Sequence, residues 1–225
     1  MVKKLRWILV VPLFVLVAFL TSEWAFGVTF HKYSIVYEFS HIDQYSGLRV
    51  DRADIAVLQP STGCGDYFTG NAIYQTQWVL LTADADNWVE LGTGHQCADT
   101  KDYHYCGYGE NGMWHAQWIG APIDNTSHTF TLARAAQSTW TCLIDGDLKS
   151  VILKDQVGYE LSVGLESYAQ SGVVTAYTSH SLNQRLVGGP WSDWAGRDAK
   201  NVDTPEMCGN WVSDISWKSG ETVSC

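Results

Sequence analysis

Positive charge is scarce in this sequence of 225 residues, which has 14 Lys and Arg against 24 Asp and Glu. Nucleic-acid binding needs clustered basic side chains that neutralise phosphates, so a formal charge of −10 argues against a DNA- or RNA-binding protein. Only 17% of the residues are charged and 13% are aromatic, which argues against intrinsic disorder. The Lys/Glu heptads of a long coiled coil are also missing. We therefore expect a folded domain of moderate size.

Several motifs of known chemistry are absent from the sequence. It contains no Gly-x-Ser-x-Gly nucleophile elbow, no His-Glu-x-x-His metal helix and no phosphate-binding glycine loop. The stretch Asp84-Ala-Asp86-Asn87 offers oxygen ligands but lacks the remaining ligands of a calcium loop, so a turn is expected there. The sequence predicts neither a metal nor a cofactor.

The N-terminus has the three-part form of a secretory signal. Lys3, Lys4 and Arg6 precede an apolar run over 7–20, and Ala25 and Gly27 suit cleavage before Val28. The run is shorter than the roughly 20 residues that span a bilayer, so we expect cleavage. The alternative is an N-terminal anchor, with membrane contact only through 7–20. Either way, residues 28–225 are expected as a single exported domain that is extracellular, at the cell surface or periplasmic. Without residues 1–27 its formal charge is about −12.

The six cysteines form an even set, which predicts disulfides in an oxidising compartment. Fifteen pairings are possible. Proximity in the chain favours Cys97–Cys106 and Cys208–Cys225, which leaves Cys64–Cys142. A zinc site is the alternative, because His95-Gln-Cys97 and His104-Tyr-Cys106 repeat one His-x-Cys unit.

The rest of the chain predicts strands throughout. Short β-branched and aromatic runs alternate with Gly, Asn, Asp and Ser clusters, and no helical period extends beyond a turn or two. Asp145-Gly146 favours a type I′ hairpin turn, and one long loop is expected over 188–206. The fold class is all-β, a two-sheet antiparallel β-sandwich. The expected strands are 34–39, 48–58, 71–82, 87–92, 113–119, 128–133, 139–144, 148–153, 159–168, 173–181 and 210–217.

Strand alternation selects the candidate site residues. If Val89 and Leu91 face the core, Trp88 and Glu90 face the other way, and the same argument places Glu166 and Tyr168 opposite Leu161, Val163 and Leu165. For 113–119 the pattern does not decide which set of residues faces inward.

Two glutamates in mid-strand beside aromatics resemble the lining of a groove, where desolvation would raise a carboxyl pKa and allow acid catalysis. Alternatively, both glutamates face solvent. Aromatic grooves also bind sugar rings. The expected ligand-binding residues are Trp88, Trp114, Trp118, Gln117 and Tyr168.

Four short segments carry a family resemblance. In order they are Gln77-Trp-Val-Leu80, Val89-Glu-Leu-Gly92, Met113-Trp-His-Ala-Gln-Trp118 and Gly164-Leu-Glu166. They resemble concanavalin A-like jelly rolls and, within these, the glutamic peptidases of the eqolisin and neprosin type. The resemblance implies catalytic roles for Glu90 and Glu166, one carboxyl activating water and the other stabilising the tetrahedral intermediate.

Three functions remain open from the sequence. The first is an exported sandwich that binds an extracellular polysaccharide or another extended polymer without chemistry. The second is an acid-acting hydrolase that uses Glu90 and Glu166, a peptidase before a glycosidase, with peptide as its substrate. The third is a structural protein of the cell surface. Fold alone does not choose among them.

Overall fold

The computed structural model describes residues 32–39, 44–53, 73–80, 86–96, 101–111, 113–124, 126–167, 177–194, 200–203 and 208–220. Every described element is a β-strand. In chain order they are β1 (Lys32–Phe39), β2 (Tyr45–Ala53), β3 (Ile73–Leu80), β4 (Trp88–Gln96), β5 (Lys101–Glu110), β6 (Met113–Pro122), β7 (Ser127–Ala136), β8 (Thr139–Ile144), β9 (Asp147–Leu153), β10 (Glu160–Ser167), β11 (Tyr177–Leu186), β12 (Trp191–Asp193), β13 (Lys200–Asp203), β14 (Cys208–Ser213) and β15 (Ser216–Gly220). Among these residues no helix is long and apolar enough to cross a membrane.

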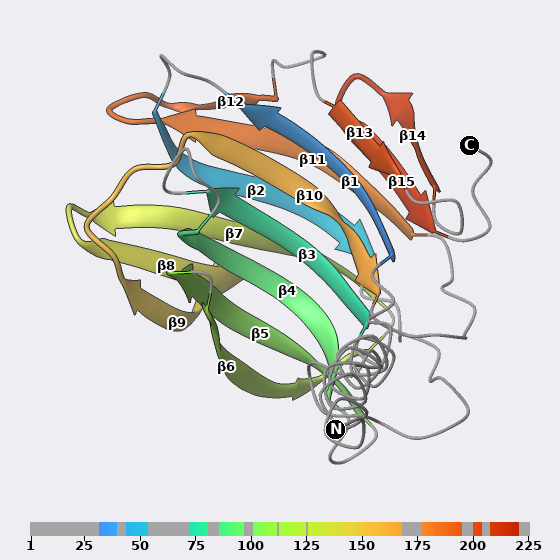
Figure 1. The fold of residues 1–225 in the computed structure, drawn as a ribbon, viewed down its shortest axis with the longest axis horizontal. Helices are drawn as coiled ribbons and strands as arrows, with labels where there is room; N and C mark the ends of the chain where they lie inside the picture. Colours follow the sequence, from blue (N-terminus) through green and yellow to red (C-terminus); the bar gives the residue numbers. More distant parts are fainter. Residues whose placement is uncertain are drawn as a thin grey trace, which may run out of the picture.

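The strands form two sheets that lie one over the other (Figure 1). The seven-stranded sheet has the order β13-β1-β10-β3-β4-β5-β6, and the eight-stranded sheet has the order β14-β15-β11-β2-β7-β8-β9, with β12 beside β11. Neighbouring strands pair antiparallel in both sheets. The predicted antiparallel β-sandwich is therefore confirmed.

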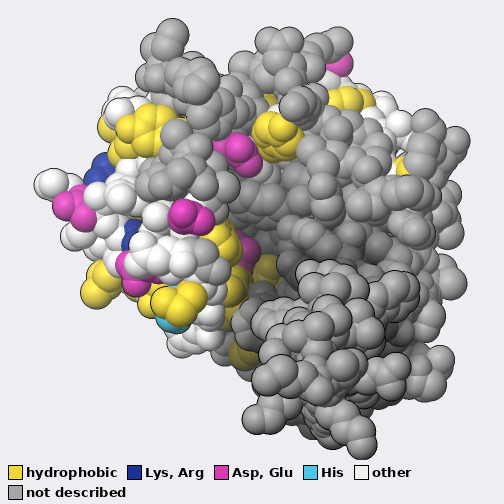
Figure 2. Space-filling model, viewed as in Figure 1, with side chains coloured by type: hydrophobic (Ala, Val, Ile, Leu, Met, Phe, Trp, Pro, Cys, Tyr) yellow, Lys and Arg dark blue, Asp and Glu magenta, His cyan; other side chains and the backbone are white. Residues whose placement is uncertain are grey.

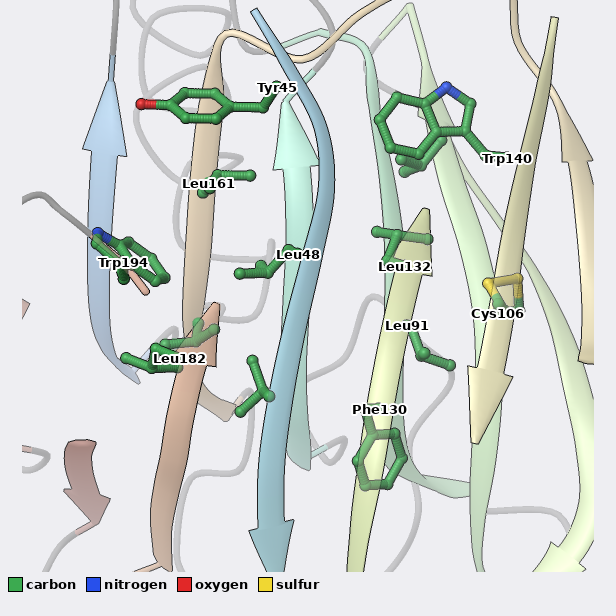
Figure 3. Close-up of a cluster of buried hydrophobic side chains, with 14 of the residues drawn as sticks. Tyr45, Leu48, Leu91, Cys106, Phe130, Leu132, Trp140, Leu161, Leu182 and Trp194 are labelled. Atoms are coloured by element: carbon green, nitrogen blue, oxygen red, sulfur yellow. A yellow bond between two sulfur atoms is a disulfide. The ribbon is translucent and has the colours of Figure 1, made fainter. Parts of the chain in front are cut away.

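One hydrophobic core fills the space between the sheets (Figure 3). Val89 and Leu91 on β4 are fully buried, as are Leu132 on β7 and Trp140 on β8. Burying each such side chain contributes about 1.5–3 kcal/mol relative to leaving it in water. Because side chains alternate along a strand, the residues between these core positions on β4 lie on the outer face of the seven-stranded sheet, turned away from the eight-stranded sheet.

Most of the expected strands are present, with shifted ends. The strand expected at 139–144 has the predicted bounds, and the predicted hairpin turn follows it, with positive φ angles at Asp145 and Gly146. The single strand expected over 210–217 is wrong, because a turn at Asp214 divides it into β14 and β15. The long loop expected over 188–206 is also wrong in part, because β12 and β13 lie within it. Strand β5 was not predicted at all.

The predicted cysteine pairings are wrong where the structure describes them. Cys106 on β5 forms a disulfide with Cys142 on β8, so the bond joins the two sheets across the core. This excludes Cys97–Cys106 and Cys64–Cys142. It also excludes the zinc site that needed the Cys106 thiolate. Cys208 is disulfide-bonded as well, but the proposed partner Cys225 lies outside the described residues.

Candidate functional site

Large and small residues complement each other across β4 and β5 on the outer face. Trp88 pairs with Gly109, Glu90 with Gly107, and Gly92 with Tyr105. A Cβ atom on Gly109 would meet the Trp88 ring at 2.2 Å, and one on Gly92 would meet the Tyr105 ring at 2.6 Å. Each large side chain therefore lies flat over the glycine of the neighbouring strand, which keeps this part of the face densely packed.

Glu90 is the central charged residue of this face. Its side chain lies over Gly107, where a Cβ atom would be 3.0 Å from Glu90 Oε1, and it accepts a hydrogen bond from the indole Nε1 of Trp114. The residue is only 7% exposed. The alternative that Glu90 faces solvent is therefore wrong, and its carboxyl group leans toward β5 and β6.

Three aromatic side chains form a small cluster beside Glu90. Tyr105 is buried, with its ring centroid 5.7 Å from that of Trp114 and 5.6 Å from that of Trp118. The two indoles are 6.4 Å apart, edge to face, and both are partly exposed. This settles the question that the sequence left open for 113–119, because Trp114 and Trp118 belong to the outer face.

The other expected binding residues are placed differently. Trp88 shares the outer face and is partly exposed. Gln117 lies on the opposite face of β6, where it accepts a hydrogen bond from Ser150 of β9 at 2.5 Å. The structure therefore separates Gln117 from the tryptophans. Tyr168 lies outside the described residues.

The backbone register places Glu166 on the outer face but far from Glu90. Glu90 faces Trp78 on β3, Trp78 faces Ser162 on β10, and Glu166 follows four residues later. At about 3.4 Å per residue and 4.8 Å between strands, the Cα atoms of the two glutamates are about 17 Å apart. One water bridging both carboxylates requires oxygens about 5.5 Å apart. The Glu166 side chain lies outside the described part, and Glu90 leans away from β10.

Glu160 is a carboxyl of the outer face that the sequence analysis missed. Burial raises its pKa, although a hydrogen bond of 2.8 Å from the Ser162 hydroxyl opposes the shift. Glu160 pairs with Leu80 on β3, and Leu80 pairs with Trp88 on β4, which is two residues from Glu90. Glu160 is therefore closer to Glu90 than Glu166 is. The sequence could have identified Glu160, because it is next to the core residue Leu161 in the strand, just as Glu166 is next to the core residue Leu165.

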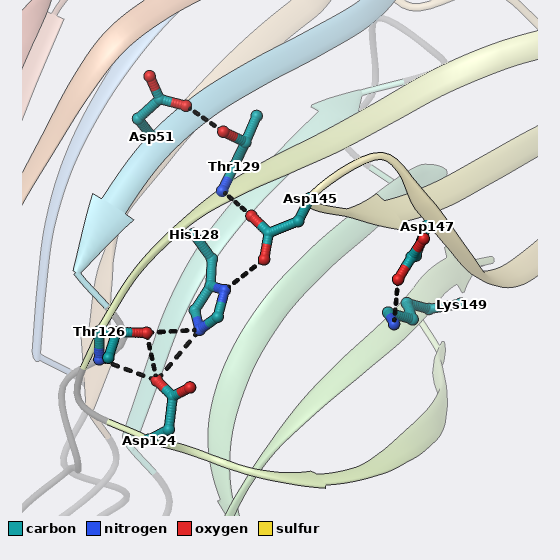
Figure 4. A network of polar contacts seen from close by, with 8 residues as sticks. All are labelled: Asp51, Asp124, Thr126, His128, Thr129, Asp145, Asp147 and Lys149. Carbon is teal, nitrogen blue, oxygen red and sulfur yellow. Dashed lines mark hydrogen bonds and ion pairs between the residues drawn. The ribbon is translucent and has the colours of Figure 1, made fainter.

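A second polar cluster lies where β7 begins, beside the turn between β8 and β9 (Figure 4). His128 Nδ1 lies 2.6 Å from Asp145 Oδ2, and its Nε2 lies 3.1 Å from Asp124 Oδ1 and 3.2 Å from the Thr126 hydroxyl. Burial lowers the pKa of His128, but its hydrogen bonds to the two carboxylates outweigh burial and raise it. A hydroxyl, imidazole and carboxylate in this order resemble a catalytic triad, but here both ring nitrogens are engaged by carboxylates, whereas a triad leaves one nitrogen to the hydroxyl alone.

Metal binding finds no support in the part of the chain that the structure describes. It contains no group of three or more His, Cys, Asp or Glu side chains that could hold a metal ion. Asp86, one of the residues weighed as a calcium ligand, is exposed, and Asp84 lies outside the described residues.

No protein-family model matches the sequence, and no curated protein matches it. Solved structures do match. Scytalido-glutamic peptidase with a transition state analog inhibitor superposes with a TM-score of 0.57 at 9% identity, over 84% of this chain and 97% of the peptidase. SCP-B, an eqolisin in complex with the tripeptide Ala-Ile-His, gives 0.57 at 7% identity, over 84% and 96%. Bacillus licheniformis beta-glucanase gives a TM-score of only 0.39 at 15% identity, over 61% and 66%. The chain therefore has the jelly-roll sandwich fold seen in the glutamic peptidases, at a distance that shows the fold alone.

Proposed function

We propose that the outer face of the seven-stranded sheet binds an extended polymer without cleaving it, and that a glycan is the first candidate. One observation carries the proposal: Trp114 and Trp118 are partly exposed beside the carboxylate of Glu90. Indole faces pack against the C–H faces of sugar rings, and the buried Glu90 carboxyl holds the Trp114 indole in place through its hydrogen bond. A site of this kind orients a ligand without needing a second catalytic carboxyl.

The packing around the cluster supports binding by a preformed surface. Trp114 is held by Glu90, and the ring of the buried Tyr105 contacts both indoles. Side chains that are already fixed lose little conformational entropy when a ligand docks on them. The rings therefore present a rigid platform.

Export of the protein belongs to the same proposal. The basic, apolar and small-residue pattern over 1–27 supports it, as does the disulfide between Cys106 and Cys142, because such bonds persist in oxidising compartments. An exported binding protein would meet polysaccharides and extended peptides, and these are the two ligand classes to compare.

The test is a binding assay with indole variants of the full chain. We expect retention on at least one insoluble polysaccharide, with affinity at least tenfold weaker for Trp118→Ala, a loss of about 1.4 kcal/mol. Trp211→Ala is the matched control, because Trp211 is also partly buried but packs on Trp217 in the eight-stranded sheet. Circular dichroism shows whether each variant is folded, and Trp118→Phe serves if the alanine variant is not. No retention of the wild type, or equal losses in both variants, overturns the proposal.

The second candidate is an acid-acting peptidase that uses Glu90 and Glu166. The fold likeness to glutamic peptidases favours it, as does the position of both glutamates on one face of the sheet. The large separation of their Cα positions in the register weighs against it. Incubation with a peptide library near pH 4, close to the ordinary pKa of a glutamate, tests it directly. Cleavage that Glu90→Gln abolishes would establish this candidate, and no binding and no cleavage together would favour a structural role.

A further inference from the structure

Exposed apolar side chains gather at one edge of the sandwich. Leu148, Val151 and Leu153 on β9 are 59%, 45% and 77% exposed, and Met113 at the start of β6 is 61% exposed. In Figure 2 apolar side chains lie along the edge where Figure 1 places β6 and β9. In soluble proteins such clusters commonly mark interaction surfaces, and sheet edges are frequent among them.

Strand β9 ends the eight-stranded sheet, and its free backbone groups can be identified. Ile152 pairs with Trp140 of β8, and two residues on the Lys154 N–H donates to the Ser138 carbonyl at 3.1 Å. Backbone groups alternate in direction along an antiparallel strand, so Ile152 also points toward β8. The N–H and C=O groups of Val151 and Leu153 therefore point outward, on the strand's open side.

From this edge we infer that the protein associates with a second copy of itself through antiparallel pairing of the two β9 strands, with the two-fold axis at Ile152. Val151 of one copy then faces Leu153 of the other. Each of these two symmetry-related pairs exchanges two main-chain hydrogen bonds, because the groups that point outward are the ones that meet. The same pairing covers two exposed apolar side chains on each copy.

Charge selects this register over its neighbours. Residues that pair across two antiparallel strands have their side chains on the same face of the sheet. An axis between two residues would pair neighbours whose side chains lie on opposite faces, so the axis must pass through a residue. With the axis at Ile152, Lys149, at the register shift between Leu148 and Ser150, comes near Asp155 of the second copy, just beyond the end of its β9, and opposite charges attract. An axis at Val151 would bring Asp147 against Asp155, and an axis at Ser150 would bring Asp147 against Leu153. Asp155 and Lys149 are both accessible, with side chains 59% and 31% exposed. Each also has an ion-pair partner in its own chain, Arg134 at 3.4 Å for Asp155 and Asp147 at 3.5 Å for Lys149.

The edge is also held in place before any association. Lys154 bonds to Glu110 at 2.5 Å, and Ser150 bonds to Gln117, so β9 is tied to β5 and β6 of the other sheet. Glu110 pairs in register with Met113, which places Met113 near the end of β9. Association therefore requires no rearrangement of the edge strands.

Sedimentation equilibrium of the full chain tests the inference. All variants carry the same apolar N-terminal run and are compared in one detergent, so any association caused by that run is the same in every variant. We expect a dimer for the wild type, and at least tenfold weaker association for Val151→Pro, which removes an outward N–H without a bond to β8. Leu153→Lys should have the same effect. Val212→Lys is the control, because Val212 is 59% exposed on β14, at the opposite edge of the same sheet, and should leave the dimer intact.

A charge swap tests the register. Lys149→Asp and Asp155→Lys should each weaken the dimer, and the double variant should restore it, because each strand then meets the opposite charge again. A monomeric wild type overturns the inference, as does a dimer that Val151→Pro and Leu153→Lys leave unchanged. Single charge variants that the double variant fails to rescue overturn the proposed register. A stable complex only with another protein would assign the edge to a different partner and would also overturn the inference.

Discussion

The indole Nε1 of Trp114 donates a hydrogen bond to Glu90, and both side chains lie on the outer face of the seven-stranded sheet. A buried carboxylate is costly unless polar groups compensate for its lost water. The bond therefore couples the charge of the site to the orientation of its aromatic platform, and a change in either residue should affect the other.

This coupling predicts the outcome of a double-mutant cycle. Trp114→Phe keeps an aromatic ring but removes the donor, so we expect the free energy of unfolding to fall by about 1.5–3 kcal/mol, as for a hydrogen bond to a charged group. Glu90→Gln keeps an acceptor oxygen without the charge, so Trp114→Phe should cost less in that background. Urea unfolding of the four proteins measures the coupling. Strictly additive effects would show that the two residues act independently.

The glycines of the outer face predict a second set of effects. Gly109→Ala and Gly92→Ala place a methyl group where the Trp88 and Tyr105 rings now lie. Overpacking of this kind should reduce stability by about 1–3 kcal/mol. Gly120→Ala is the matched control on β6, because a Cβ atom there meets nothing within 4 Å, and it should be neutral or slightly stabilising. Thermal unfolding distinguishes these outcomes, and equal shifts in all three variants would contradict the packing argument.

These glycines also explain what the sequence could not predict. Gly107 and Gly109 interrupt the aromatic alternation of β5 and are typical of a turn, so no strand was expected there. Their role becomes visible only when β4 lies beside β5 and Glu90 and Trp88 cover them. Local signals were sufficient elsewhere. The Asp145-Gly146 turn is confirmed, as is the outward orientation of Glu90 opposite its core neighbours.

The cysteine pairing depends on long-range geometry in the same way. Cys106 and Cys142 are 36 residues apart and meet only because β5 and β8 face each other across the core. The chain-entropy model gives a bond closing a loop of this length about 4 kcal/mol of stability. We expect Cys106→Ala/Cys142→Ala to lose up to this amount in guanidinium unfolding. Reductant should destabilise the wild type more than the double variant, and any shift that remains in the variant arises from the disulfides of the other four cysteines, which include Cys208.

The cluster around His128 predicts a pH-dependent contribution to stability. His128 has a raised pKa, so its bonds to Asp124 and Asp145 stabilise the fold fully below its ordinary value of 6.5 and are lost as pH rises through the folded value. Hydrogen bonds from Thr126 and His128 lower the pKa of Asp124 to about 2. Its contribution is therefore complete above its ordinary value of 3.8 and is lost as pH falls toward 2. The cluster should stabilise the protein most between about pH 4 and 6.5.

His128→Gln tests this window. We expect the variant to melt below the wild type near pH 5 and the difference to shrink on both sides, as the imidazole loses its proton above and the carboxylates gain theirs below. The loss should be about 1 kcal/mol or less, since the pairs are partly exposed and screened by solvent. His180→Gln is the control, because the ring of His180 contacts the hydroxyl of Ser216. A difference that stays constant from pH 4 to pH 9 would mean that His128 acts through packing against His104 and Phe130 rather than through its charge.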